Sequence, residues 1–335
     1  MQAHSSIDDK YIIHHESPVK ANLRGLSTPS PSIAWASGTE GTYIRTTNYG
    51  QSWTAAQIAG AEKLNFRDIK AFDANTAYIM SAGPGALSCV YKTENSGESW
   101  EIKITGSEND FFDCMAFWNR MRGIILGDTD PTTNRFNIYL TDNGGESWSR
   151  ISENAIPPSL ENEAAFAASG SCAIAYGELD ACFVTGRFNA RAFHTHDGGK
   201  SWQVTSTPIM HDTPSAGIYS VSFRGKIGVI AGGDHREPDR GGSNLAMTSD
   251  GGNNWELIEV SPQYYWSAVS LAPDLEHLIV VGPKQAGLIH SESKYVWKKE
   301  SKVSLNAVSF WSDSNRALAV GESGAIVEFV VARKM

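Results

Sequence analysis

An eight-residue motif recurs along the chain with a period of about 50 residues. Each copy begins with Thr, carries Asn or Asp two residues later and Gly two residues after that, and ends on Trp. The clear copies are Thr46–Trp53, Thr93–Trp100, Thr141–Trp148, Thr195–Trp202 and Thr248–Trp255, and a degenerate copy is His290–Trp297. Their Trp residues are separated by 47, 48, 54, 53 and 42 residues. A period of this length indicates a repeat architecture such as a propeller.

The motif has the chemistry of a tight turn between two strands. Its Asn or Asp side chain can accept hydrogen bonds from backbone N–H groups of the turn. Its Gly supplies a backbone conformation with positive φ, and its Trp buries a large ring between sheets as the next strand begins. Turn geometry therefore accounts for these residues, and we do not interpret the Asp as catalytic or as a metal ligand.

Two apolar segments lie between successive motifs, and the second of them ends in small residues. The first segments are Phe66–Phe72, Phe111–Phe117, Ala164–Ser169, Ile218–Phe223, Tyr265–Leu271 and Leu305–Phe310. The second segments are Ala77–Ala82, Gly123–Gly127, Ala181–Gly186, Gly228–Gly232, Leu278–Gly282 and Ala317–Gly321. With one strand entering each motif and one leaving it, every repeat contains four strands, which is one blade of a propeller.

The count of repeats predicts an all-β, seven-bladed propeller in a single domain. We expect the blades at about 22–60, 64–105, 110–153, 162–207, 216–261, 264–301 and 303–332. The last repeat lacks a fourth strand, and residues 10–15 near the N-terminus form an unassigned strand-like segment. Pairing this segment with the last blade would close the ring and cover an exposed sheet edge. A loose N-terminal arm beside an open ring is the alternative.

The motifs resemble the Asp-box (BNR) repeats of sialidases. The chain as a whole is more similar to bacterial BNR-repeat propellers related to the Ycf48/HCF136-like photosystem II stability/assembly factors. The stretches that carry this resemblance are 23–27, 34–53, 111–128, 163–171 and 217–234. The resemblance implies a propeller that binds a partner or ligand. The Phe-Arg-Ile-Pro stretch of sialidases is missing, since Phe66-Arg67-Asp68-Ile69 departs from it, and neither their Arg triad nor their nucleophilic Tyr can be assigned here.

Charge and hydropathy exclude several classes of partner. The formal net charge is −9 and no cluster of Lys and Arg stands out, so we expect no nucleic-acid binding. No apolar run reaches the ~18 residues of a membrane-spanning helix. The first ten residues are polar and unlike a signal peptide. The compartment stays open between the cytoplasm and export to the periplasm or outside, with a signal absent from this chain.

The four cysteines are Cys89, Cys114, Cys172 and Cys182, and no CxxC pair is present. A zinc ribbon or a thioredoxin-like site is therefore not supported. Cys172 and Cys182 flank a turn and could face each other across a hairpin. We expect either two buried thiols or a disulfide there, the disulfide implying an oxidising compartment.

Two long polar loops, Gly127–Phe136 and Gly232–Asn244, are expected on the face that carries the connections between second and third strands. Ligands of propellers usually lie on that face, over the channel. The ligand-binding candidates are Arg67, Asp113, Arg135, Arg187, Arg191, Tyr219, Asp234, His235, Arg236 and Trp266. Arg grips carboxylates with two hydrogen bonds, so this surface could hold an anionic or sugar-like molecule. Turn capping by Asp128 and Asp234, and ion pairs between these Arg and Asp residues, are the structural alternatives.

Two functions fit these residues. The first is a scaffold that binds an unknown protein partner, a carbohydrate or an anionic small molecule, with no cofactor and no metal. The second is a sialidase-like glycoside hydrolase or lyase, which needs two carboxylates on this face, one with a raised pKa. The candidates for that pair are Asp128 or Asp130 with Asp234 or Glu237. A redox enzyme would need a cofactor, and no dinucleotide-binding motif is present.

Overall fold

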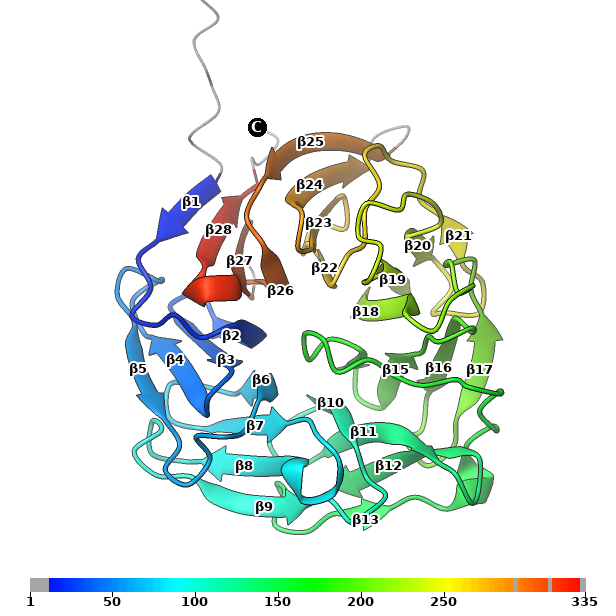
Figure 1. Ribbon diagram of the computed structural model, residues 1–335, viewed down its shortest axis with the longest axis horizontal. Coiled ribbons are helices and arrows are strands. Elements are labelled where there is room, and N and C mark those ends of the chain that lie inside the picture. The colour runs from blue at the N-terminus through cyan, green and yellow to red at the C-terminus, as the bar shows by residue number, and fades with distance from the viewer. Residues whose placement is uncertain (1–11, 292–294, 313–314, 332–335) are drawn as a thin grey trace, which may run out of the picture.

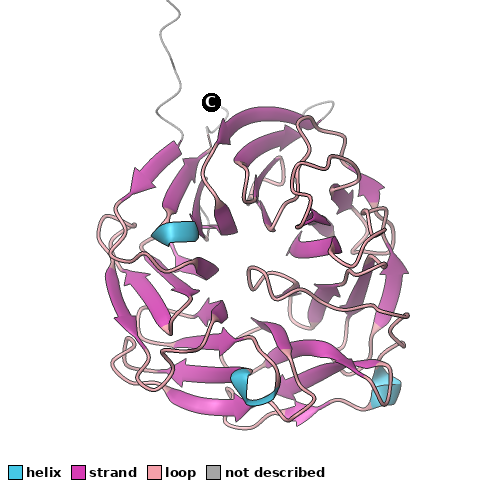
Figure 2. Cartoon of the chain, viewed as in Figure 1, coloured by secondary structure: helices cyan, strands magenta, loops and turns pink. Residues whose placement is uncertain are grey.

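The chain folds into seven antiparallel sheets arranged in a ring, as Figure 1 shows in a view down its shortest axis; we call the central region that the ring surrounds the channel. This computed structural model describes residues 12–291, 295–312 and 315–331. Each sheet has four strands, and the described residues add only three short 3₁₀ turns, Gly85–Leu87, Glu153–Ala155 and Glu322–Gly324 (Figure 2). The predicted seven-bladed propeller is confirmed.

Strands run from the channel outward within each blade. Blade one is β2 (Leu23–Ser30), β3 (Ile33–Gly38), β4 (Thr42–Thr46) and β5 (Thr54–Gln57), and blade two is β6 (Phe66–Ala71), β7 (Ala77–Ser81), β8 (Cys89–Thr93) and β9 (Glu101–Thr105). Blade three is β10 (Phe112–Phe117), β11 (Gly123–Asp130), β12 (Arg135–Thr141) and β13 (Ser149–Arg150), and blade four is β14 (Ala173–Tyr176), β15 (Asp180–Val184), β16 (Arg191–Thr195) and β17 (Gln203–Ser206). Blade five is β18 (Ala216–Arg224), β19 (Ile227–Asp234), β20 (Leu245–Thr248) and β21 (Glu256–Leu257), and blade six is β22 (Ala268–Leu271), β23 (His277–Val281), β24 (Ala286–Ser291) and β25 (Tyr295–Ser301).

Blade seven joins the two ends of the chain. It contains β26 (Leu305–Phe310), β27 (Arg316–Gly321), β28 (Ile326–Val330) and, on its outer edge, β1 (Ile12–His15). Strand β1 pairs antiparallel with β28, from Ile12 opposite Phe329 to His15 opposite Ile326. The predicted closure by an N-terminal strand is confirmed for these residues; residues 10 and 11 lie outside the described part of the chain.

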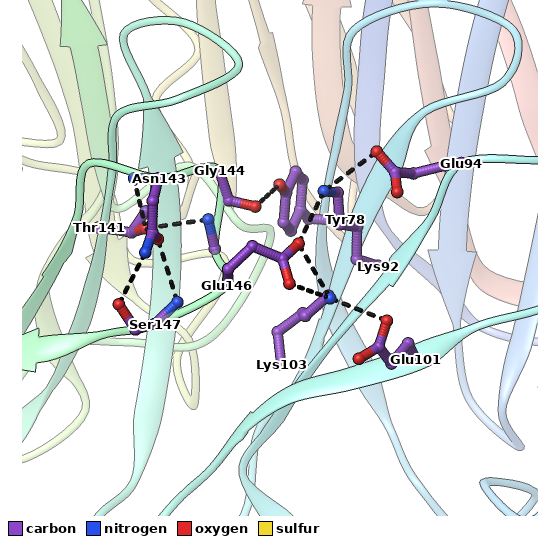
Figure 3. Close-up of polar contacts among 11 residues, drawn as sticks. Tyr78, Lys92, Glu94, Glu101, Lys103, Thr141, Asn143, Gly144, Glu146 and Ser147 are labelled. Carbon is purple, nitrogen blue, oxygen red and sulfur yellow. Dashed lines mark hydrogen bonds and ion pairs between the residues drawn. The ribbon is translucent and has the colours of Figure 1, made fainter.

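Each complete Asp-box forms the expected clip, shown for blade three in Figure 3. The Thr141 hydroxyl accepts the N–H of Gly145 at 2.9 Å and donates to Oδ1 of Asn143 at 2.9 Å. Asn143 in turn accepts the N–H of Ser147 at 3.0 Å. The same bonds recur in the other four complete copies. The degenerate copy, His290–Trp297, includes residues 292–294, which lie outside the described residues.

The boxes also tie neighbouring blades together, because the turn of one blade lies beside the strands of the preceding one (Figure 3). The Tyr78 hydroxyl of blade two donates to the carbonyl of Gly144 in the box of blade three. Glu146, in the same box, accepts from Lys92 at 3.3 Å and from Lys103 at 2.8 Å. One turn motif therefore fixes both the hairpin and the packing of adjacent sheets.

Two predicted boundaries are wrong. Ala164–Ser169 is not the first strand of blade four; that strand is β14, and residues 165–171 form a loop. The segment Gly127–Phe136 is not a long loop, because β11 and β12 extend toward each other until Asp130 pairs with Arg135. The carboxylate of Asp130 accepts the Thr132 N–H at 2.8 Å, and Asn134 has a φ of 51°, so residues 131–134 form a tight turn.

The cysteine pairing also differs from the expectation. Cys172 forms a disulfide with Cys114, while Cys182 and Cys89 are free and buried. In the hairpin of β14 and β15, Cys182 lies opposite Ile174, and the carbonyl of Cys172 accepts the N–H of Val184. Cys172 and Cys182 are therefore out of register, whereas Cys172 meets the inner strand of the preceding blade.

The hydrogen bonds of the box lead to a first prediction. Replacing Thr141 by Val removes the hydroxyl and leaves the buried N–H of Gly145 without its acceptor, which should lower the free energy of unfolding by about 1–3 kcal/mol. Asn143→Asp is the matched control, because Asp197 and Asp250 make the same bond in their boxes, and its effect should stay within about 0.5 kcal/mol. Urea unfolding monitored by Trp fluorescence measures both. Equal stability of the Val variant and the wild type would contradict this role of the box.

Candidate functional site

The innermost strands present selected side chains to the channel through β-bulges. In five of these strands the pairing register slips by one residue near the start. The residues at the slips are Arg24, Arg67, Asp113, Tyr219 and Asn306. A bulge turns the side chain of the extra residue out of the regular alternation. All five line cavities at the channel mouth.

In blade four the corresponding slip is expanded into a loop of seven residues, 165–171, which we call the channel loop. It begins where Ala164 pairs with Gly186, and it ends at Cys172, whose carbonyl accepts the N–H of Val184. The disulfide of Cys172 to Cys114 fixes this end to blade three. In Figure 1 a green loop reaches into the central opening from this side of the ring.

Hydrogen bonds from five other blades hold the channel loop. Its carbonyls accept from Arg24 at 3.3 Å, Arg67 at 3.0 Å and Lys70 at 2.9 Å. On the other side, the Ala165 N–H donates to Asp128 at 3.2 Å. Further bonds join Ser169 to the carbonyl of Ser267 and Ser171 to the hydroxyl of Ser220. The loop is thus fixed across the channel by blades one, two, three, five and six.

The channel loop separates two cavities on the face that carries the connections between second and third strands, which we call the loop face. The mouth cavity, of about 410 Å³, is lined by Arg24, Arg67, Phe166, Ala167, Ala168, Tyr219, His235, Tyr265, Ser267, Pro283, Asn306 and Glu322. The side cavity, of about 280 Å³, is lined by Arg67, Ala82, Phe111, Asp113, Asp128, Ala164, Ala165, Phe166, Ala167 and Arg187. Arg67, Phe166 and Ala167 line both cavities.

The aromatic wall of the mouth cavity is rigid. The rings of Phe166 and Tyr219 stack with centroids 4.1 Å apart and planes 3° apart, and Tyr265 meets Tyr219 edge-on at 4.7 Å. The Tyr219 hydroxyl donates to the carbonyl of Ser215 at 2.7 Å and lies 2.8 Å from Nδ1 of His235. These contacts position the ring edges before any ligand arrives.

Two carboxyl groups, the buried Asp113 and the half-buried Asp128, share the side cavity. Asp113 is 1% exposed, and burial together with the nearby charge of Asp128 raises its pKa well above the usual range. Burial raises the pKa of Asp128 to about 6, although the Ala165 N–H opposes the shift. Two like charges this close disfavour ionisation of both groups, so the pair holds a proton more readily than an exposed Asp.

Several predicted ligand residues do line the two cavities. Arg67, Tyr219 and His235 contribute to the mouth cavity, and Arg67, Asp113 and Arg187 contribute to the side cavity. The structure thus brings together half of the predicted set, and binding of a ligand by these residues remains a prediction.

Four other predicted residues line neither cavity. Arg135 donates to the carbonyl of Glu153 at 3.2 Å, and Arg191 forms a buried ion pair with Glu163. Trp266 is 0% exposed and lies in the core between blades five and six, not at the channel mouth. Arg236 is exposed on the loop after β19 and lines neither cavity.

The carboxylate pairs expected for a hydrolase are not assembled as predicted. Hydrogen bonds from Thr132 and Arg150 lower the pKa of Asp130 to about 2. The pKa of Asp234 is also lowered, because hydrogen bonds from Ser215 and Thr213 outweigh its burial. Glu237 is exposed on the loop after β19. Asp128 has the raised pKa that a general acid needs, but its neighbouring carboxyl is Asp113.

Residue-by-residue inspection of the sequence missed much of the mouth cavity. Arg24 occupies the same place in its repeat as Arg67, so alignment of the repeats could have identified it. Asn306 is marked in the same way in blade seven. Phe166 was predicted to lie in a strand. Glu322 lies in a 3₁₀ turn, outside the two long loops that supplied many of the candidates.

Within the described part of the chain, no group of three or more His, Cys, Asp or Glu residues is arranged to hold a metal ion. Among the helices of that same part, none has the length and apolar character needed to cross a membrane.

The carboxyl pair of the side cavity leads to a second prediction. Because Asp128 has a pKa of about 6 when folded and about 3.9 when unfolded, the native state takes up a proton as the pH falls and becomes more stable. This stabilisation is lost as the pH rises through 6. Asp128→Asn keeps an acceptor for the Ala165 N–H, so it should stabilise the protein by about 1–3 kcal/mol at pH 8.

The measurement is the free energy of unfolding in urea between pH 4 and 8. Asp130→Asn is the control of opposite sign: its lowered pKa means that the wild-type carboxylate stabilises the fold at neutral pH, and the variant should be less stable there. An Asp128→Asn variant that is destabilised at pH 8 would contradict the assigned pKa shift.

Two known proteins are similar to this chain in sequence. No family model matches the chain. The Photosystem II assembly lipoprotein Ycf48 of Synechococcus sp. (strain CC9902) is 23% identical over 273 residues, which are 80% of this chain and 71% of the relative. The chloroplastic Photosystem II stability/assembly factor HCF136 of Arabidopsis thaliana is 30% identical over 133 residues, 39% of this chain and 30% of the relative.

Solved structures match nearly the whole chain. YCF48 bound to D1 peptide has a TM-score of 0.67 at 15% identity and covers 97% of both chains. YCF48 from Cyanidioschyzon merolae has a TM-score of 0.65 at 15% identity, covering 96% of this chain and 99% of that one. U3-55K, with a TM-score of 0.68 at 10% identity, shares the fold. By sequence and by fold together, the chain is a seven-bladed β-propeller homologous to the Ycf48/HCF136 photosystem II assembly factors.

Proposed function

We propose that this chain is a protein-binding propeller with the role of an assembly factor, and that its loop face is where a segment of a partner protein docks. The observation that carries this proposal is an exposed aromatic residue, Phe188, held on that face beside the side cavity. The likeness to a structure of YCF48 with a bound D1 peptide supports a peptide segment as the occupant.

The loop that carries Phe188 is strained. Arg187 and Phe188 have φ values of 62° and 63°, a conformation that is unfavourable for a bulky side chain. Phe188 nevertheless leaves 46% of its surface exposed, while Arg187 lines the side cavity. This backbone strain is not compensated by burial of the Phe188 side chain in the core. Strain of this kind is often found in functional loops. The exposed Leu160 lies on the neighbouring connection, to which Asn189 bonds through the carbonyl of Glu161.

A hydrolase activity has less support. The comparisons show assembly factors, and the predicted carboxylate pairs are engaged in hydrogen bonds and ion pairs or exposed. Recognition of a partner needs only a rigid scaffold with exposed apolar and charged groups, which the loop face provides.

The proposal predicts that Phe188→Asn weakens partner binding without lowering stability. Asn tolerates the left-handed conformation, so the free energy of unfolding should stay equal or rise by up to about 1 kcal/mol. Loss of the ring should reduce recovery of the cross-linked partner several-fold. The measurement is chemical cross-linking in the native organism, purification of the chain and quantitative mass spectrometry.

Leu275→Asn is the matched control. Leu275 has a φ of 63° and is 42% exposed, but it lies in the turn between β22 and β23, on the opposite face. We expect it to leave partner recovery unchanged. Equal loss in both variants, or no partner enriched with the wild type, would contradict docking on the loop face.

We also propose that the chain works outside the cytoplasm. The disulfide between Cys114 and Cys172 links the inner segments of two blades, and such bonds persist in oxidising compartments. The names of the relatives, a lipoprotein and a chloroplastic factor, support a compartment beyond the cytosol.

If the chain is exported, the protein purified from its own organism should contain one disulfide and two free thiols. After alkylation under denaturing conditions without reductant, two thiols, Cys89 and Cys182, should be labelled and the pair Cys114–Cys172 should remain joined. Intact-mass spectrometry and peptide mapping measure this directly. Labelling of all four cysteines would contradict the proposed location.

A further inference from the structure

Arg24 and Arg67 lie together in the mouth cavity without an acidic partner. Each donates to one carbonyl of the channel loop, Arg24 to Ala168 and Arg67 to Ala167. Among the described residues neither forms an ion pair, and Nε of Arg67 is enclosed with no acceptor. Both side chains are half-buried, and charged groups withdrawn from water are usually paired.

The two guanidinium groups disfavour each other's charge. Burial and the nearby charge of Arg24 lower the pKa of Arg67 to about 10. Burial also lowers the pKa of Arg24, while the charge of Glu322 opposes that shift. A fold that holds two such cations side by side bears an electrostatic cost, and an anion placed between them would remove it.

The charge of the cavity indicates the kind of anion. Arg24 and Arg67 contribute two positive charges and Glu322 contributes one negative charge, which leaves one positive charge on the ionised groups other than His235. A dianion such as phosphate would leave an excess of negative charge beside Glu322. A monoanion balances the cavity, and the carboxylate is the monoanion whose geometry matches a guanidinium.

The lining of the same cavity also includes aromatic rings. Phe166, Tyr219 and Tyr265 supply rings already fixed by stacking and edge contacts. A ligand with a flat apolar body gains contact area there at little cost in ordering. The volume of about 410 Å³ lies in the range of small-molecule sites.

We propose that Arg24 and Arg67 form a subsite for a monocarboxylate with a ring-shaped apolar body, whose carboxylate contacts the two guanidinium groups and whose ring packs against Tyr219 and Tyr265. The site stands independently of docking on the loop face. Its ligand is either a free aromatic acid or the carboxyl-terminal aromatic residue of a peptide, and the two share the same chemistry.

The test uses 3-phenylpropionate as the probe and its neutral analogue 3-phenylpropanamide, measured by isothermal titration calorimetry at constant salt. The acid should bind at least about tenfold more tightly than the amide, because hydrogen bonds to charged groups contribute about 1.5–3 kcal/mol. Arg24→Gln and Arg67→Gln keep a donor for the loop carbonyls and should each weaken binding of the acid by about tenfold, with little effect on the amide.

Arg135→Gln is the matched control, since Arg135 donates to the carbonyl of Glu153 and lines neither cavity. It should leave binding of the acid unchanged. Equal affinity of the wild type for acid and amide, no binding of the acid at millimolar concentration, or an equal loss in Arg135→Gln would overturn the proposal. The comparison of acid with amide on the wild type does not depend on how well any variant folds.

Two peptides distinguish the source of the carboxylate. Gly-Gly-Phe with a free carboxyl terminus should bind more tightly than 3-phenylpropionate if the natural ligand is a peptide end, and more weakly if it is a free acid; the amidated peptide should bind at least about tenfold more weakly than the free one in both cases. Equal affinity of the two peptides would overturn the subsite. Phe188→Asn should leave binding of 3-phenylpropionate unchanged, so failure of the docking proposal and failure of this one give different results.

Discussion

The pairing of β1 with β28 is the interaction on which the rest of the structure depends. Every blade packs between two neighbours, so the ring is rigid only when its first and last segments are joined. His15 lies 3.1 Å from a carboxylate oxygen of Glu328, and Arg316 bonds the other oxygen. These contacts lower the pKa of Glu328 although its burial acts in the opposite direction. The carboxylate is 1% exposed, so the closure combines strand pairing with a buried charge cluster.

A closed ring allows a small change in strand pairing to build a site. One slipped residue at the start of a strand has little effect on a sheet that is held on both sides. In blades one, two and five that slip places Arg24, Arg67 and Tyr219 on the same cavity. In blade four it becomes the channel loop, which five other blades fix in place. The repeat therefore supplies the scaffold, and its deviations at one register position supply the chemistry.

Much of the fold was predictable because the box is local. Thr, Asn or Asp, Gly and Trp act within eight residues, and their spacing together with the apolar segments between them predicted the blades. The closing strand was predicted from the missing fourth strand of the last repeat. The site was less predictable because it depends on contacts between distant segments. The bulge at Arg24 requires knowledge of the pairing partner, and the disulfide of Cys114 with Cys172 requires the packing of two blades. The turn at residues 131–134 is different: its Asp-Pro-Thr-Thr-Asn sequence was a readable local signal.

Several unfavourable features of the molecule lie around the channel mouth. Arg24 and Arg67 face each other's charge, Asp113 and Asp128 share a buried space, and Phe188 is exposed in a strained conformation. In the five complete boxes, on the other face, the Thr hydroxyl and the side-chain oxygen of the Asn or Asp are hydrogen-bonded to each other. Such unfavourable features persist in folded proteins where a partner or ligand removes their cost. These features together support our proposal that binding takes place on the loop face.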